Sequence, residues 1–350
     1  MVVPVAKVAF FELEGWEEPR IRSELSGHSL YLSRKPLTLE EAKLARDAEI
    51  VSVFIYSRID RKVLDELPSL RAIVTRSAGI DHIDLNACAE RGIEVYNVPD
   101  YSPESAAEYA ILLAMALARN LHVMLRSDDL RLDAEQVRGW RLAGRTMGVI
   151  GTGRIGSHAA KLARALGMRV LAYDLYVNEE LAKLHQVEYV DLDTLLSSSD
   201  VITIHVPLTQ ETRHLINRRN VRRIKRGAIL INTARGGLVE TEALLEALDE
   251  GLRAGAALDV FEGEWVLRSD WSELVKSERV NEEELRKAIL ALRLSRHPRV
   301  ILTPHVAYNT WEAVEQILTR TINTVSEILS GRRPKNIVTP IVPPVPAKVL

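Results

Sequence analysis

The chain has 350 residues with a nearly balanced charge, 46 lysines and arginines against 48 aspartates and glutamates. This length exceeds what one hydrophobic core usually fills, and 47% hydrophobic residues are enough for two cores, so we expect two domains. A formal net charge of -2 gives no long-range field to attract nucleic acid or an anionic membrane surface. The expected partner is therefore a small molecule.

The single cysteine, Cys88, excludes an internal disulfide and a cysteine-built metal site, and no metal is predicted. The N-terminal residues lack the basic stretch and long apolar run of a secretory signal. The longest apolar run, YAILLAMALA at 109–118, is about half as long as a membrane span. These features favour a cytoplasmic protein.

Short apolar runs alternate with helical patterns in the first third of the chain, which is typical of βαβ units around a parallel sheet. The predicted strands here are 5–11, 50–56, 72–75 and 93–96. The segment DLNACAERG at 84–92 has the Asp start and Gly stop of a short helix. These elements predict one doubly wound domain.

After a proline break, the residues 98–120 predict a long helix that is apolar on nearly all sides. Such a helix is expected to be buried between domains or between subunits. A second series of predicted strands then follows at 147–150, 169–173, 201–206, 228–232, 256–260 and 300–303. Six strands are the number expected of two mononucleotide-binding halves.

Two further regions stand apart from this series. A charged insert at 265–298 contains NEEELRKAILALRLSRH, which predicts an amphipathic helix with an Asn cap. The last residues, 334–350, are rich in proline, and we expect them to form an extended tail.

The segment VIGTGRIG at 149–156 places a G-x-G-x-x-G pattern between a predicted strand and a predicted helix. In that context Gly151 suits a tight turn, Gly153 suits close approach to a pyrophosphate, and Gly156 suits tight packing of helix on strand. The helix would offer its first N–H groups to the phosphates. This context predicts a dinucleotide site.

Asp174 ends the next predicted strand, 18 residues after Gly156. An acidic side chain there accepts hydrogen bonds from the adenosine ribose and repels a 2′-phosphate, which favours NAD over NADP. The alternative is an ordinary Asp in a turn.

Three polar residues closely follow predicted strands of the second series, namely Arg235, Glu264 and His305. Each one alone is compatible with a surface or structural role. Because ligands bind outside the carboxyl ends of the strands in open α/β sheets, all three are expected at one edge. A guanidinium for a carboxylate, a proton donor, and a carboxylate that keeps the donor charged together suit the reduction of a 2-keto acid.

The sequence resembles the D-isomer-specific 2-hydroxyacid dehydrogenases over almost its whole length, and within that family the lactate dehydrogenase branch. The motifs that carry the resemblance are RSAGIDHID, NVPDYSPESAAEYA, VIGTGRIG, IHVPLTQETRHLIN, INTARGGLVET, LDVFEGE and TPHVAYNT. The resemblance implies a Rossmann NAD-binding domain at 102–305. It also implies a discontinuous, flavodoxin-like substrate domain at 1–101 and 306–333.

The resemblance also assigns site residues. It implies that Arg235 binds substrate, that His305 is the acid and base, and that Glu264 is its partner. Residues implied to contact substrate are Tyr56, Ala78, Gly79, Tyr101 and Tyr308. Residues implied to contact NAD, besides the three glycines, are Arg154, Ile155, Asp174, Val206, Pro207, Thr212, Thr233, Ala234 and Asp259.

The expected reaction is hydride transfer between NADH and a small 2-keto acid, with pyruvate and D-lactate as the expected pair. Tyr308 and Leu132 stand where this branch commonly has Phe and Trp, so a bulkier acid, glyoxylate or hydroxypyruvate is an alternative. A second alternative function is an NAD(H)-sensing scaffold like the C-terminal-binding corepressors. The helix around 109–118 would serve a homodimer in either case.

Overall fold

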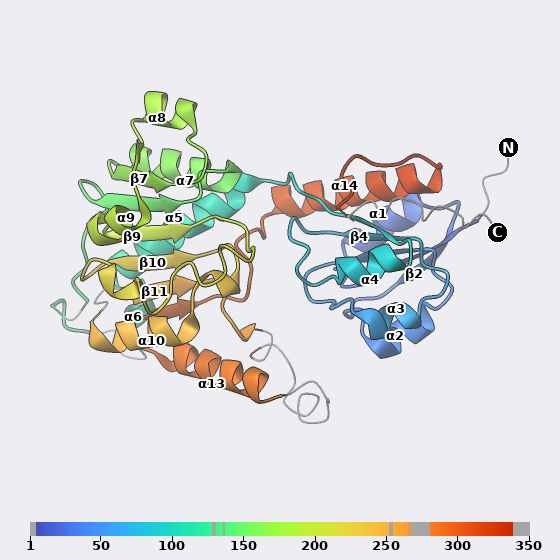
Figure 1. Cartoon of the computed structure of the whole chain (residues 1–350), viewed down its shortest axis with the longest axis horizontal. Coiled ribbons are helices and arrows are strands. Elements are labelled where there is room, and N and C mark those ends of the chain that lie inside the picture. Colours follow the sequence, from blue (N-terminus) through green and yellow to red (C-terminus); the bar gives the residue numbers. More distant parts are fainter. Residues whose placement is uncertain are drawn as a thin grey trace, which may run out of the picture. The chain divides into compact units, whose positions relative to one another are not determined.

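The computed structural model describes residues 5–127, 131–135, 137–251, 255–264, 267 and 281–338. The chain forms two compact units (Figure 1). Unit 1 comprises Met1–Ser102 and Thr310–Leu350, and unit 2 comprises Pro103–Asn309. None of the helices in the described ranges is long and apolar enough to cross a membrane.

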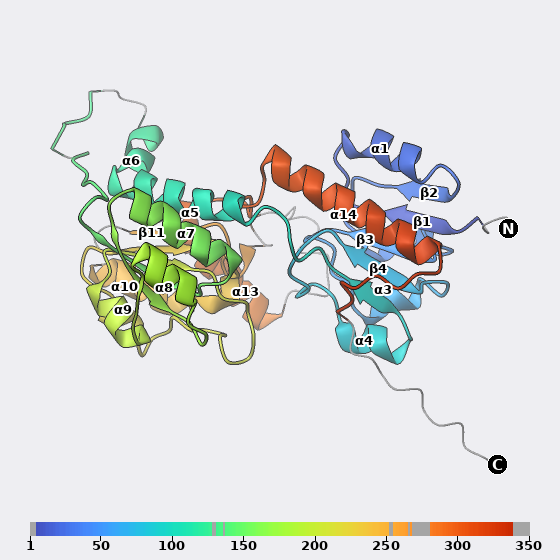
Figure 2. The same ribbon diagram turned by 90° about the horizontal axis from the view of Figure 1, so that it is seen from above.

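Unit 1 is built on a five-stranded parallel sheet in the order β2-β1-β3-β4-β5, the flavodoxin-like arrangement. Its strands are β1 (Lys7–Phe10), β2 (Ser29–Leu32), β3 (Ile50–Val53), β4 (Ala72–Thr75) and β5 (Glu94–Tyr96). Its helices are α1 (Glu17–Glu24), α2 (Leu39–Leu44), α3 (Arg61–Asp65), α4 (Leu85–Glu90) and α14 (Trp311–Leu329). Helices α1 and α14 cover one face and α2 to α4 the other (Figures 1 and 2).

Unit 2 is built on a seven-stranded parallel sheet in the order β12-β11-β10-β9-β6-β7-β8, the Rossmann order with one added strand. Its strands are β6 (Thr146–Ile150), β7 (Arg169–Tyr173), β8 (Glu188–Tyr189), β9 (Val201–Ile204), β10 (Ile229–Asn232), β11 (Gly255–Leu258) and β12 (Val300–Leu302). The predicted fold class is confirmed, because the named strands of both units pair only in parallel.

The helices of unit 2 cover both faces of this sheet. They are α5 (Pro103–Ala118), α6 (Leu121–Arg126), α7 (Arg154–Ala165), α8 (Glu179–His185), α9 (Leu192–Ser198), α10 (Thr241–Glu250) and α13 (Glu282–Arg296). Two short 3₁₀ helices, η1 (Val221–Arg223) and η2 (Gly236–Leu238), lie in loops. Helices α5 and α7 pack side by side on one face, and α9, α10 and α13 cover the other (Figure 2).

Strands and helix starts form where the sequence supplies the required residues. The central strands β3, β4, β9 and β10 are fully buried and mostly apolar, as expected of strands covered on both faces. The helix predicted at 84–92 is α4, capped by the Asp84 side chain. The helix predicted in the insert is α13, capped by the Asn281 side chain. Residues 268–280 of that insert lie outside the described residues.

Three expectations about the chain's organisation differ from the structure. The strands β2 and β8 are missing from the prediction, because both lie at sheet edges and carry few buried residues. The second series therefore has seven strands, not six. Residues 336–338 do not start a separate tail but hydrogen-bond to β5 and its end, and 339–350 lie outside the described residues. Unit 2 extends to Asn309, beyond the boundary expected after His305, because Asp259 binds the loop that follows His305.

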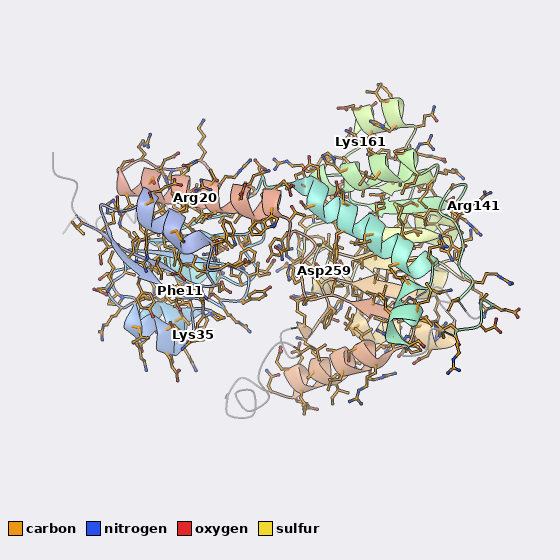
Figure 3. All side chains as sticks on the ribbon, turned by 180° about the vertical axis from the view of Figure 1, so that it is seen from behind. Phe11, Arg20, Lys35, Arg141, Lys161 and Asp259 are labelled. Carbon is orange, nitrogen blue, oxygen red and sulfur yellow. The ribbon has the colours of Figure 1, made fainter. Side chains whose placement is uncertain are left out.

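A buried ion cluster joins the carboxyl ends of β1, β3 and β4 in unit 1. The Arg76 side chain donates hydrogen bonds of 2.8 Å to the carbonyl oxygens of Phe11 and Glu12, and its Nε lies 3.8 Å from Glu17 Oε1. The Glu12 carboxylate accepts the main-chain N–H groups of Phe54 and Tyr56. Burial raises the pKa of both Glu12 and Glu17, and the nearby Arg76 charge opposes that rise. Phe11 lies inside unit 1 (Figure 3).

We expect Arg76→Met to lower the free energy of unfolding by about 3–5 kcal/mol, because it leaves buried carboxylates without their cation. Urea denaturation measures this. The matched control is Arg20→Met, which breaks an exposed pair with Glu24 on α1 and costs less than about 1 kcal/mol (Figure 3).

The loss in free energy of unfolding caused by Arg76→Met also depends on pH. A carboxyl whose pKa is raised in the folded state binds protons more readily folded than unfolded, so stability rises as pH falls through that range. In the variant the Arg76 charge no longer opposes this rise in pKa, so its stability increases more than that of the parent as the pH falls. The deficit in the free energy of unfolding should therefore shrink between pH 7 and pH 5. A deficit equal to that of the Arg20 variant, or one that grows at low pH, contradicts the cluster's role.

Candidate active site

The glycine loop connects β6 to α7. Gly151 has a φ of +91°, and a Cβ on Gly156 would lie 1.8 Å from the Gly151 carbonyl oxygen, so the helix packs on this turn only without a side chain there. At Gly153, the N-cap of α7, a Cβ would meet nothing within 4 Å in the described chain. Arg154 and Ile155 form the first turn of α7, which carries no acidic residue. The open space before this helix N-terminus fits a pyrophosphate.

Asp174 follows β7 and is fixed beside the glycine loop. Its Oδ2 accepts the main-chain N–H of Thr152 at 2.6 Å and the Thr152 hydroxyl at 3.1 Å. Its Oδ1 accepts the N–H of Tyr176 at 3.1 Å. A carboxylate has about four acceptor positions, so it retains capacity for a ribose hydroxyl. Leu175 and Tyr176, which follow it, are exposed and uncharged.

The loops after β9 and β10 complete this edge of the sheet. After β9 come Val206 and Pro207, and the Thr212 hydroxyl donates to the Pro207 carbonyl oxygen at 2.6 Å, which closes the loop. After β10 come Thr233 and Ala234, and the Thr233 hydroxyl is buried without a partner among the described residues. A buried polar atom without a partner is rare in folded proteins. It fits a position where a cofactor supplies the hydrogen bond.

His305 and Glu264 form a hydrogen-bonded pair at the ends of β12 and β11, with 3.1 Å between His305 Nδ1 and Glu264 Oε1. The backbone of His305 is left-handed, with a φ of +57°. Its N–H donates to the carbonyl oxygen of Asp259 at 3.1 Å. His305 is therefore held by hydrogen bonds of both its main chain and its ring.

Asp259 is fully buried at one side of unit 2 (Figure 3). Its carboxylate accepts the Thr303 hydroxyl at 2.6 Å and the main-chain N–H groups of Val306 at 2.9 Å and Ala307 at 2.8 Å. The resemblance implies a cofactor contact for Asp259. In the structure the hydrogen bonds of Asp259 fix the loop that carries His305.

A cavity of about 180 Å³ opens beside this pair within unit 2. Its lining residues are Asp259, Phe261, Glu264, Leu267, Leu302, Thr303, Pro304 and His305. Most of the wall is apolar, and its titratable groups are the His305 imidazole and the carboxyls of Asp259 and Glu264. This arrangement suits a proton transfer to a small bound molecule.

Arg235 begins the loop after β10 and is half-buried. The Asn232 side chain orders this loop, because its Oδ1 accepts the Ala234 N–H at 3.1 Å and its Nδ2 donates to the Arg235 carbonyl oxygen at 2.8 Å. One nitrogen of the guanidinium donates to the Ala234 carbonyl oxygen at 2.7 Å. A guanidinium has five donors in a planar fork, a geometry that matches a carboxylate.

In unit 1, the loop after β4 carries Ala78 and Gly79. All three carbonyl oxygens of 77–79 accept hydrogen bonds. The Ser77 oxygen accepts the Val98 N–H, the Ala78 oxygen accepts the Asn97 side-chain amide, and the Gly79 oxygen accepts the Ser77 hydroxyl. The N–H groups of Ala78 and Gly79 have no acceptor in the described chain. Consecutive main-chain N–H groups of this kind bind anions.

The three predicted pocket tyrosines are distributed over both units. Tyr56 and Tyr101 belong to unit 1, and Tyr308 belongs to unit 2. The Tyr56 ring is 40% exposed and lies edge-on to Phe54 at 6.2 Å. Tyr101 and Tyr308 are half-buried. Their assignment to the substrate stays a prediction.

Sequence reasoning missed a second strand-end histidine, His205, directly after β9. Its Nε2 lies 2.9 Å from the Thr203 hydroxyl, and burial lowers its pKa to about 4, so it is neutral at neutral pH. The rule that found His305, a polar residue after a buried strand, could have found it too.

Comparison with known proteins identifies the family. Residues 111–307 match the family model described as D-isomer specific 2-hydroxyacid dehydrogenase, NAD binding domain. The chain is 39% identical over 317 residues to 2-hydroxyacid dehydrogenase A of Aspergillus oryzae, covering 89% of this chain and 86% of that protein. The chain belongs to the D-isomer-specific 2-hydroxyacid dehydrogenases.

Two further relatives of this dehydrogenase are D-lactate dehydrogenases. The Escherichia coli protein is 35% identical over 330 residues, covering 93% of this chain and 97% of that one. The structure of D-lactate dehydrogenase from Aquifex aeolicus, complexed with NAD and lactic acid, has a TM-score of 0.80 and 37% identity, covering 93% and 96%. The predictions of the family, of a dehydrogenase and of NAD as cofactor are confirmed.

We expect Asp174→Ser to narrow the preference for NADH over NADPH by about tenfold, which corresponds to about 1.4 kcal/mol, because the charge that repels a 2′-phosphate is lost. The ratio of kcat/KM for the two cofactors measures this. The control is Glu188→Ser, which removes an exposed charge from edge strand β8. An unchanged ratio in the Asp174 variant means that the ribose is recognised elsewhere.

Proposed function

We propose that this dehydrogenase reduces a small 2-keto acid with NADH to the D-2-hydroxy acid, and that pyruvate is its preferred substrate. The observation that carries the proposal is the His305–Glu264 pair beside a small, largely apolar cavity. Such a cavity suits a short aliphatic group. The D-lactate dehydrogenases among the relatives support the choice of pyruvate.

His305 is the proposed acid and base. The glycine loop and Asp174 would hold NADH, which would supply the hydride for the keto carbon. Negative charge would then develop on the keto oxygen. Because Nδ1 faces Glu264, the proton delivered to that oxygen leaves from Nε2. The Glu264 carboxylate fixes the ring's orientation through its contact with Nδ1. Oxidation of the hydroxy acid uses the same contacts in reverse, with His305 neutral at the start.

Arg235 and the 78–79 loop are the proposed binding groups for the substrate carboxylate. The planar guanidinium has parallel donors that match a carboxylate, and one more can reach the keto oxygen. The N–H groups of Ala78 and Gly79 add two uncharged donors.

We also propose a cytoplasmic homodimer. Most apolar side chains of helix α5 are buried, but Leu112 and Met115 are 53% and 37% exposed. Leu121 and Leu125 of the neighbouring α6 are 39% and 77% exposed. A second copy covering this apolar face explains them. The support for a cytoplasmic location is the free thiol of Cys88. This thiol is buried, and burial raises its pKa to about 12.

A panel of 2-keto acids with NADH tests the reaction, followed as loss of NADH absorbance. Pyruvate should be the best substrate, ahead of hydroxypyruvate, glyoxylate and branched acids. A higher kcat/KM for a branched acid would assign the enzyme to bulkier substrates. NADH binding without turnover of any acid would favour the scaffold alternative instead.

His305→Gln should lower kcat for pyruvate by about 10²–10⁴-fold, because it removes the proton donor. The dissociation constant of NADH should stay nearly unchanged, as measured by fluorescence titration. Glu264→Gln keeps the size but not the charge and should lower kcat by a smaller factor. A His305 variant that retains the parent's turnover would exclude this residue as the acid.

Arg235→Lys keeps the positive charge but loses the planar fork. We expect kcat/KM for pyruvate to fall by about 10- to 100-fold, because one lost charged hydrogen bond costs about 1.5–3 kcal/mol. Arg218→Lys, on an exposed residue paired with Glu246, is the control. Equal kinetics for the Arg235 variant and the parent would remove Arg235 from the binding site.

A further inference from the structure

The edge strand β5 of unit 1 is covered by residues 336–338 after α14. Tyr96 and Ile337 form an antiparallel bridge, and the Val338 N–H donates to the Val95 carbonyl oxygen at 2.8 Å. Ile337 packs against the core under α1 and α14, and Val338 packs against the core on the other face. The segment is therefore anchored on both sides of the sheet.

Asn336 holds the residue that follows β5. Its carbonyl oxygen accepts the Asn97 N–H at 3.2 Å, and its side-chain Nδ2 donates to the Asn97 carbonyl oxygen. The same Nδ2 lies 3.2 Å from the Thr324 hydroxyl of α14. Both main-chain groups of Asn97 are thus bound to one residue of the segment.

Asn97 in turn fixes one peptide of the 77–79 loop. Its side chain is buried, with 8% of the residue exposed, and Nδ2 donates to the Ala78 carbonyl oxygen at 2.8 Å. In a trans peptide the carbonyl and the next N–H point in opposite directions. The bond to the Ala78 oxygen therefore sets the direction of the Gly79 N–H.

The neighbouring peptide is set in the same way but by a different donor. The Ser77 carbonyl oxygen accepts the Val98 N–H at 3.0 Å, which sets the direction of the Ala78 N–H. The Ser77 hydroxyl then donates to the Gly79 carbonyl oxygen at 2.6 Å. Asn97 and Val98 are adjacent, so holding Asn97 in place controls both N–H groups.

We propose that Asn336 and Asn97 are positioning residues that aim the N–H groups of Ala78 and Gly79 at the substrate carboxylate. This inference rests on the proposed function of those N–H groups. Neither asparagine needs to touch substrate. The segment after α14 thereby contributes to substrate affinity through a chain of hydrogen bonds across β5.

The test is a steady-state comparison of Asn97→Ala and Asn336→Ala with the parent, using pyruvate and NADH. We expect KM for pyruvate to rise by about three- to tenfold in each, the size of one weakened hydrogen bond. The inhibition constant of oxamate, a carboxylate that cannot be reduced, should rise in parallel. Both kcat and the NADH dissociation constant should stay within about twofold, since His305 and the glycine loop are untouched.

The control is Asn220→Ala, a half-buried asparagine of unit 2 whose Nδ2 donates to the Leu215 carbonyl oxygen at 2.8 Å. It lowers stability without changing KM. Thr324→Val is a milder variant that removes only the hydroxyl partner of Asn336, and it should raise KM by a smaller factor. It keeps the test valid if an alanine variant does not fold.

The outcomes separate the two proposals. A parent that reduces no 2-keto acid overturns the proposed function. A parent that is active, with variants whose KM and oxamate inhibition match those of Asn220→Ala, overturns the positioning role alone. A fall in kcat at constant KM also overturns it, because it would mean that the asparagines act on the chemical step.

Discussion

The carboxylate of Asp259 is the constraint on which the geometry of the His305–Glu264 pair depends. It is buried, and its hydrogen bonds to Thr303, Val306 and Ala307 fix the loop after β12. A non-glycine residue at positive φ, as at His305, is uncommon and costs free energy. The bonds to Asp259 on both sides of His305 offset that cost. With this backbone the imidazole lies 3.1 Å from Glu264.

Parallel topology brings the remaining groups of unit 2 to the same edge. The glycine loop follows β6, Asp174 follows β7, and Arg235 and His305 follow β10 and β12. In a parallel sheet all these loops leave at the carboxyl ends of the strands. Residues far apart in sequence therefore lie at the same edge of the sheet. The same rule places Glu12, Tyr56 and the 77–79 loop at one edge of unit 1.

The parts of this structure that were predictable have local causes. Buried strands such as β9 are apolar runs, α4 and α13 begin at capping side chains, and the glycine spacing is readable in eight residues. Edge strands β2 and β8 bury little and left no such pattern. The bond between Asn336 and Asn97, the clamp by Asp259 and the unpartnered Thr233 hydroxyl depend on contacts over long sequence separations. No periodicity or spacing reports them.

The two strand-end histidines show how partners, and not position alone, decide chemistry. His205 and His305 both follow buried strands of the same sheet. His205 has a hydroxyl as its neighbour, and burial lowers its pKa to about 4, so it stays neutral and cannot deliver a proton at neutral pH. His305 instead has a carboxylate at 3.1 Å from Nδ1, which fixes the orientation of its ring. The strand-end rule therefore finds candidates, and the Glu264 carboxylate distinguishes His305 from His205 as the candidate for the proposed proton transfer.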